Sequence, residues 1–166
     1  MSLIILSLSA YVFINSIKDC LERKSIMVTV ALYRGPSELH ILQSEIYIFQ
    51  LKSDGALEVF YGDRFADDFI DPKNINLVKN ERKVLSEDQL VQINQKINQI
   101  KNSEFEENLV RHGWNAIIKC SGKSYRFAYG RANDKNHDEL VTMLIEISPF
   151  EIVNSAGHVV EQVIID

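Results

Sequence analysis

The strongest constraint on the fold is a pair of strand-like runs that flank a tight turn. The runs are 46–51 (IYIFQL) and 57–61 (LEVFY), both rich in β-branched and aromatic residues. Asp54 and Gly55 lie between them, and this pair readily adopts the positive φ angles of a hairpin turn. Both runs are apolar at consecutive positions. We therefore expect them to be central in a sheet, or covered on the second face by a partner.

A helix is predicted to begin at Ser86. Ser86 and Gln89 have the spacing of a capping box, and Leu85 and Leu90 stand at the two positions of a hydrophobic staple. Apolar residues then recur at helical spacing, at Leu90, Ile93, Ile97 and Ile100. Burying each of these side chains contributes about 1.5–3 kcal/mol before conformational entropy is subtracted, so this helix is expected to face the core.

A second hairpin and a second helix follow. Residues 114–120 and 124–129 are strand-like and flank a turn at Ser121-Gly122. Asn133 or Asp134 is expected to cap a helix that carries Leu140, Met143, Leu144 and Ile147 and ends before Pro149.

The predicted fold is an α+β domain in which an antiparallel sheet built from β-hairpins carries two to three packed helices. A chain of 166 residues is long enough to bury a core without disulfides or metals, and we expect a single domain over 1–166. Its predicted parts are an N-terminal strand and helix over 1–25, a hairpin-helix-hairpin-helix core over 26–148, and a strand-like tail over 149–166. Residues 26–33 add a further strand to the core.

The region between the first hairpin and the first core helix is predicted to hold a loop and an edge strand. Residues 63–80 are acidic and are expected to be irregular, and 78–85 is expected to be an edge strand. Lys79, Arg82 and Lys83 are charges that discourage edge-to-edge pairing.

Charge and hydropathy exclude several functional classes. The formal net charge is −5, and the short basic cluster on the edge strand is outweighed by Asp63, Asp67, Asp68 and Asp71, so we expect no nucleic acid. The apolar stretch 3–17 is shorter than a bilayer span and lacks a basic signal-peptide region, so a membrane is not expected. The expected location is cytoplasmic, or exported if a native leader has been removed.

Two segments partly match ligand-binding motifs, and both matches fail. Ser121-Gly122-Lys123-Ser124 resembles the end of a phosphate-binding loop, but Ile117 replaces the first glycine and the segment joins two strands. Asp134, Asn136 and Asp138 alternate as in a calcium-binding EF-hand loop, but Glu139 replaces its glycine and Ile145 its final carboxylate. A hairpin turn and a helix cap explain them better.

The remaining reactive residues are scattered along the sequence, and we predict no catalytic, cofactor-binding or metal-binding residues. The acidic loop matches no defined metal cage. Cys20 and Cys120 are expected to be small buried residues. The other residues considered are His40, His112, His137, His158, Trp114, Glu104, Glu106 and Glu107. Of these, the His112–Trp114 turn is expected to pack inward at Trp114, and the glutamates to be solvated.

The sequence therefore favours a binding or protein-interaction module without catalytic activity. The expected partners are a second copy of the chain, held by strand pairing through 46–51, 57–61 or the tail 150–165, or another protein. The alternatives are a small enzyme whose site combines the loop 63–71 with the His112–Trp114 turn, and the soluble part of an exported or membrane-tethered protein.

Overall fold

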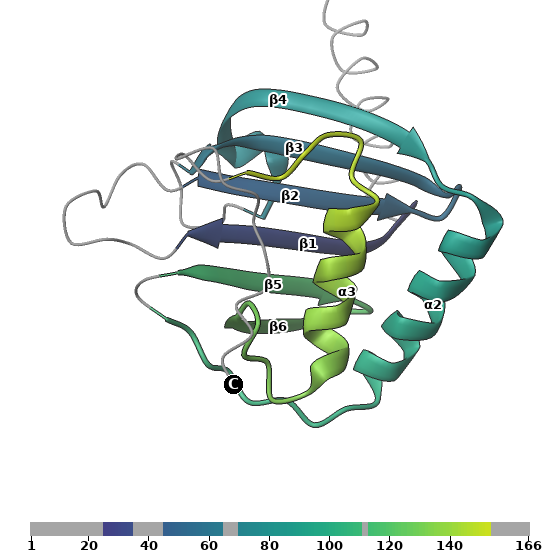
Figure 1. Ribbon diagram of the computed structural model, residues 1–166, viewed down its shortest axis with the longest axis vertical. Coiled ribbons are helices and arrows are strands. Elements are labelled where there is room, and N and C mark those ends of the chain that lie inside the picture. The colour runs from purple at the N-terminus through teal and green to yellow at the C-terminus, as the bar shows by residue number, and fades with distance from the viewer. Residues whose placement is uncertain (1–24, 35–44, 65–69, 111–112, 154–166) are drawn as a thin grey trace, which may run out of the picture.

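The computed structural model of the protein describes residues 25–34, 45–64, 70–110 and 113–153 (Figure 1). Six strands in these ranges form one sheet in the order β4-β3-β2-β1-β5-β6. All neighbouring strands are antiparallel. The strands are β1 (Ile26–Arg34), β2 (Glu45–Lys52), β3 (Ala56–Arg64), β4 (Ile75–Val84), β5 (Trp114–Cys120) and β6 (Lys123–Ala128).

The two predicted hairpins are confirmed. β2 pairs with β3 around Asp54-Gly55, where Gly55 has a φ of +81°. β5 pairs with β6 around Ser121-Gly122, with φ angles of 51° and 78°. β2 and β3 are internal strands of the sheet, as their apolar runs predicted.

The prediction of an irregular segment over 63–80 is wrong at both of its ends. β3 continues to Arg64, and a short 3-10 helix, η1 (Pro72–Asn74), leads directly into β4. The predicted edge strand is confirmed, but β4 starts at Ile75, before the expected boundary. The start of β4 was not predicted because its residues are mostly polar. An edge strand does not need the alternation of apolar and polar residues by which a half-buried strand is recognised.

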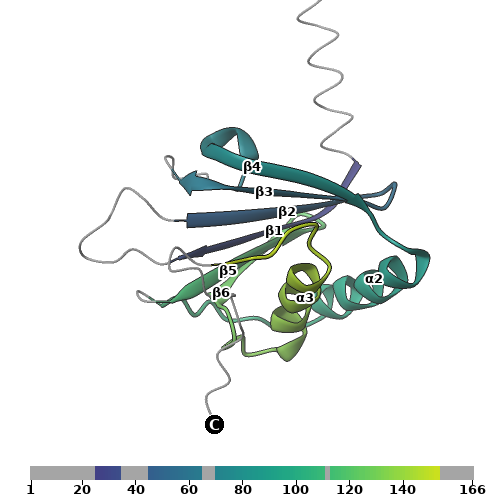
Figure 2. The same cartoon turned by 45° about the horizontal axis from the view of Figure 1, so that its top comes forward.

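Two helices, α2 (Glu87–Lys101) and α3 (Lys135–Glu146), lie side by side on one face of the sheet (Figure 2). The capping box is present at the start of α2. The Ser86 hydroxyl accepts from Gln89 N–H at 3.3 Å, and Ser86 N–H donates to the Gln89 side chain at 3.0 Å. The buried residues of the helices that form the core with the sheet are Ile93, Ile97, Ile100, Leu140, Val141 and Leu144.

Both faces of the sheet are apolar near its centre. In β1, Val28, Val30 and Leu32 pack against the helices, whereas Ala31 and Tyr33 belong to a second cluster on the opposite face. That cluster also contains Ile46, Ile48, Ile70, Ile75 and Ile117, with Phe60 packed against it. We call the sheet face turned away from α2 and α3 the far face.

The chain after α3 crosses the helix-bearing face of the sheet toward β4 (Figure 1). Tyr47 O–H donates to the Val153 carbonyl, and Val153 N–H donates to the Tyr47 oxygen at 3.3 Å. Lys83 Nζ donates to the Ile147 carbonyl at 3.2 Å, and Lys79 Nζ lies 4.3 Å from the centre of the Phe150 ring. Residues 147–153 are therefore fixed to β2 and β4.

The strand and helix predicted for 1–25 lie, except for residue 25, outside the described residues, as does the tail after Val153. The third helix of the predicted fold falls in that N-terminal region. None of the helices in the described part of the chain is both long enough and apolar enough to cross a membrane.

Candidate functional site

A row of polar residues crosses the far face. The strand registers place one residue from each strand side by side, because Thr29 pairs with both Gln50 and Lys119. Gln50 pairs in turn with Glu58, and Lys119 with Ser124. The complete row is Ser124, Lys119, Thr29, Gln50, Glu58 and Arg82. In the row that follows toward the other end of the sheet, Ile117, Ala31, Ile48 and Phe60 are apolar. The far face thus changes from polar to apolar between adjacent rows.

A groove of about 730 Å³ lies over the polar row. We call it the far-face groove. Its floor includes Thr29, Gln50, Glu58 and Lys119, and an apolar wall is formed by Phe60, Ile70, Pro72 and Leu77. Its charged lining consists of Lys52, Lys73, Lys119, Lys123, Glu58 and Asp71. Lys52 Nζ and Glu58 Oε1 form an ion pair at 2.8 Å.

Three local structures form the borders of the far-face groove. The first is the start of β1, where the register shifts between Ile26 and Val28. The second is the turn at Ser121-Gly122, which is a hairpin turn, as predicted, between two strands. The third is η1, whose N-terminal cap Asp71 accepts from Lys73 N–H at 3.0 Å.

The acidic residues of the segment 63–71 are described only at Asp63 and Asp71. Asp63 lies in β3 and Asp71 caps η1, whereas Asp67 and Asp68 lie outside the described residues. Among the described residues there is no group of three or more histidine, cysteine or acidic side chains that would hold a metal ion.

A buried polar cluster lies under α3, around His137. This side chain is 0% exposed and is surrounded by the rings of Phe105, Tyr125 and Phe127 at centroid distances of 4.6, 4.9 and 5.7 Å. His137 Nδ1 lies 3.3 Å from the Asp134 carbonyl and 3.6 Å from Asp134 Oδ2. Burial lowers the pKa of His137, against the opposing effect of the nearby acidic residues, so the ring is neutral near pH 7.

The carboxylates beside His137 have structural roles. Asp134 is the N-cap of α3, as one of the two predicted alternatives, and accepts from Asn136 N–H at 3.0 Å. Asp138 accepts from Gly130 N–H at 2.7 Å and from Ala132 N–H at 2.9 Å, which fixes the loop before the helix. Burial opposes the ionisation of both carboxylates. It raises the pKa of Asp138, whereas hydrogen bonds from Asn136 and Ser103 lower the pKa of Asp134.

The buried cluster contains polar atoms that lack partners among the described residues. Tyr125 Oη, Asp134 Oδ2 and His137 Nε2 are each buried without a hydrogen bond. Both carboxylates are near His137 in the sequence, at positions 134 and 138, and the start of α3 holds Asp134 Oδ2 3.6 Å from His137 Nδ1. None of these three side chains lines the far-face groove.

The thiol of Cys120 is buried, as predicted, and its backbone position lies at one end of the far-face groove. Burial raises the pKa of this thiol, more than the nearby lysines lower it, so it is protonated near neutral pH. Cys20 lies outside the described residues.

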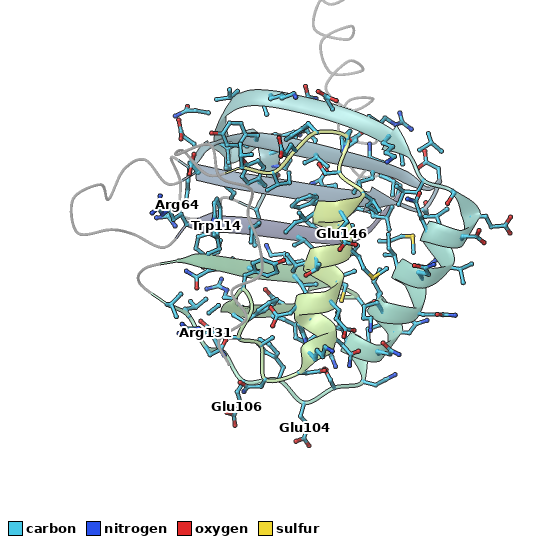
Figure 3. The ribbon with its side chains drawn as sticks, in the orientation of Figure 1. Arg64, Glu104, Glu106, Trp114, Arg131 and Glu146 are labelled. Carbon is cyan, nitrogen blue, oxygen red and sulfur yellow. The ribbon has the colours of Figure 1, made fainter. Side chains whose placement is uncertain are left out.

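The described ends of the loop 63–71 in the predicted loop-assembled site lie on different faces of the sheet, because Asp63 follows Tyr61 on the face that carries Trp114 and Asp71 is on the far face. Trp114 packs on the helix-bearing face, with its ring 6.0 Å from that of Tyr47, whereas Asp71 lines the far-face groove. Residues 65–69 lie outside the described part of the chain, as do His40, His112 and His158. Glu104, Glu106 and Glu107 are exposed, as predicted, and Figure 3 shows the first two pointing outward at the end of the molecule away from β4.

The outer edge of β4 is the most exposed apolar surface of the sheet. Leu77, Val78 and Val84 are 51%, 68% and 70% exposed. The charges between them have partners within the chain, since Lys79 pairs with Glu81 at 2.9 Å and Arg82 with Asp54 at 3.3 Å. This edge combines strand hydrogen-bonding groups with apolar side chains.

The similarity of the chain to known proteins gives no functional assignment. No protein-family model matches the sequence, and no curated protein matches it.

Proposed function

We propose that this protein is a non-catalytic interaction module that pairs with a second copy of itself along β4. The observation that carries the proposal is the exposure of Leu77, Val78 and Val84 on an edge strand of ten residues. Edge strands present unpaired backbone donors and acceptors, and exposed apolar residues on such an edge favour pairing with another chain. β2 and β3, which the sequence suggested for pairing, have both edges occupied within the sheet.

The charge pattern of β4 favours one register for this pairing. Two identical antiparallel strands are related by a two-fold axis, and directly opposed residues alternate between hydrogen-bonded and non-hydrogen-bonded pairs. With the axis at Asn80, this residue faces its own copy, Lys79 faces Glu81 of the second copy, and Val78 faces Arg82. Opposite charges at directly opposed positions stabilise a strand pair by roughly 0.2–1 kcal/mol each. The register contains two such pairs.

The registers centred on Lys79, Glu81 and Arg82 are disfavoured by like charges. An axis at Lys79 brings two copies of Lys79 together, and an axis at Glu81 brings two copies of Glu81 together. An axis at Arg82 places Arg82 against itself. The basic residues that discourage unspecific edge pairing therefore also favour the self-complementary alignment centred on Asn80.

The absence of catalysis in this proposal is supported by the location of the reactive side chains. In the described part of the chain, His137 lies beside the carboxylates of Asp134 and Asp138. The His137 side chain is fully buried. Asp138 is occupied by two backbone donors, and the thiol of Cys120 is protonated. A nucleophile or general base needs access to substrate within hydrogen-bond reach, which these groups lack.

A charge-reversal pair tests the proposed dimer. Lys79→Glu alone places the introduced carboxylate against Glu81 of the second copy, and Glu81→Lys alone places the introduced ammonium group against Lys79, so each variant should be monomeric. An equimolar mixture of the two variants restores both opposite-charge pairs and should form a heterodimer. Analytical ultracentrifugation over a range of concentrations measures all three samples beside the unsubstituted protein.

Glu106→Lys is the matched control, because Glu106 is exposed at the end of the molecule away from β4 (Figure 3). It should dimerise like the unsubstituted protein. A second test is the substitution Asn80→Cys, which should give an intermolecular disulfide, whereas Arg82→Cys should not. The unsubstituted chain controls for Cys20 and Cys120. A protein that remains monomeric at all concentrations, or equal crosslinking of both variants, contradicts the proposal.

A small enzyme acting in the far-face groove is the second candidate function. The observation that favours it is the convergence of Glu58, Asp71 and several lysines on this concavity. The ion pair between Glu58 and Lys52 ties up one of the carboxylates. If a ligand of the groove is recovered chemically unchanged after incubation with the protein, the result supports a binding module. If the ligand is converted, and the substitution Glu58→Gln abolishes the conversion, the result supports an enzyme.

A further inference from the structure

We infer that the far-face groove binds a small organic anion that has an apolar body. This inference goes beyond self-pairing along β4, because the groove lies within one chain. Its volume of about 730 Å³ is in the range of sites for small molecules, roughly 300–1,000 Å³. The lining determines the class of ligand, through its charge, its donors and its apolar wall.

The sign of the charge in the groove is opposite to that of the whole protein. The lining contains three lysines besides Lys123 and two carboxylates, a local excess of one positive charge in a chain with a formal net charge of −5. The Lys52–Glu58 pair is internally neutral. Lys123 lies opposite Cys120, whose side chain belongs to the core under the helices, and its Nζ donates to the Lys101 carbonyl of α2 at 3.0 Å, so this ammonium group lies on the helix-bearing side. Clefts lined by one sign of charge concentrate ligands of the opposite sign.

Lys119 is the central hydrogen-bond donor in the floor of the far-face groove. Its side chain is exposed, and the register places it directly between Ser124 on one neighbouring strand and Thr29 on the other. Directly opposed residues have Cβ atoms roughly 4.5–5.5 Å apart, so one ammonium group and two hydroxyl groups lie within reach of a single anionic group. Hydrogen bonds to ionised groups are the strong ones, which makes this part of the floor suited to a carboxylate, sulfonate or phosphate.

The apolar wall sets the second property of the ligand. Phe60 lies two residues beyond Glu58 on the same face of β3, and Ile70, Pro72 and Leu77 continue the wall. Leu77 is 51% exposed, so a bound apolar group would remove its side chain from water. A divalent cation fits this lining poorly, because only two carboxylates contribute to it and one of them is paired with Lys52.

Two dyes that differ by one anionic group test the inference. 1-Anilinonaphthalene-8-sulfonate carries a sulfonate, and N-phenyl-1-naphthylamine has the same aromatic body without it. Fluorescence titration of the folded protein should show one site per chain for the sulfonate dye and at least tenfold weaker binding of the neutral dye. Raising the salt concentration should weaken the binding of the sulfonate dye alone.

Lys119→Gln should weaken binding of the sulfonate dye by about tenfold, the size expected for one charged hydrogen bond, and leave binding of the neutral dye unchanged. The matched control is Lys135→Gln, since Lys135 is an exposed lysine of α3 outside the groove. Near-ultraviolet circular dichroism confirms that each variant is folded. Equal affinity of both dyes, or equal loss in the Lys119 and Lys135 variants, overturns the inference. Monomer and dimer both contain the groove, so failure of β4 pairing leaves this test unaffected.

Discussion

Replacing Gly62 with alanine should separate β4 from β3. Gly62 lies at a register shift in this strand pair, where the backbone of β4 approaches β3 closely. A Cβ atom on Gly62 would lie 2.2 Å from the carbonyl oxygen of Asn76, 2.9 Å from its carbonyl carbon and 3.2 Å from the Cα atom of Leu77. All three contacts are with the backbone, so no side-chain rotation relieves them.

The geometry gives a magnitude for this substitution. Restoring the shortest contact from 2.2 Å to an ordinary separation of 3.4 Å requires β4 to move by 3.4 − 2.2 = 1.2 Å. A shift of that size lengthens the neighbouring ladder hydrogen bonds beyond their useful range. Losing about two such bonds at roughly 1 kcal/mol each, together with overpacking strain of about 1–3 kcal/mol, predicts that the free energy of unfolding falls by roughly 3–5 kcal/mol.

Urea denaturation followed by tryptophan fluorescence measures this loss, because the single tryptophan, Trp114, packs against Tyr47 in the core. Gly122→Ala is the matched control. Gly122 has a positive φ of +78°, which Gly62 does not, but an added Cβ at Gly122 would meet nothing within 4 Å. This control should therefore lose only the conformational cost of about 1–2 kcal/mol. A loss at Gly62 no larger than the loss at Gly122 would refute the argument from close approach.

Three further substitutions test other parts of the fold by the same denaturation assay. Ser86→Ala removes the capping hydroxyl that accepts from Gln89 N–H and should cost about 1 kcal/mol. Tyr47→Phe leaves the backbone groups of Val153 without their partner and should cost about 1–3 kcal/mol, detected also as faster proteolysis of the chain after α3. Burial lowers the pKa of His137, so the unfolded chain binds this proton more readily, and stability should fall as the pH drops below about 6.5. His137→Leu should remove this slope, and an unchanged slope between pH 7.5 and 5.5 contradicts the assignment.

The sequence predicted those elements whose signals are local. The capping box at Ser86 and the Asp54-Gly55 turn depend on residues within a few positions of each other, and both are present. The start of β4 was missed because its residues are mostly exposed, so the strand has no alternation of polar and apolar side chains. The position of an edge strand depends on the neighbouring strand with which it pairs. The sequence of the edge strand alone does not identify that neighbour or the register of the pairing.

The residues of the candidate sites were harder to predict than the helices and strands, because the sites depend on the register between strands. The polar row of the far-face groove takes Thr29, Gln50 and Lys119 from three strands separated by up to 90 positions, and only their alignment in the sheet brings them together. His137 looked like one scattered histidine, yet it meets Phe105 and Tyr125 through packing of α3 on the sheet. A signal was present in the apolar surroundings of His137 along α3, where a polar ring on the buried face of a helix requires a partner.

The register shift at Gly62 connects the edge of the sheet with the far-face groove. Lys79 pairs with Tyr61 and lies on the helix-bearing face, so an uninterrupted β4 would place Leu77 on that same face. The shift makes Leu77 pair with Gly62 instead, which turns its side chain to the far face, where it lines the groove. Because only a residue without a side chain permits this approach, one glycine both shapes the strand proposed to pair with a second copy and completes the apolar wall of the groove.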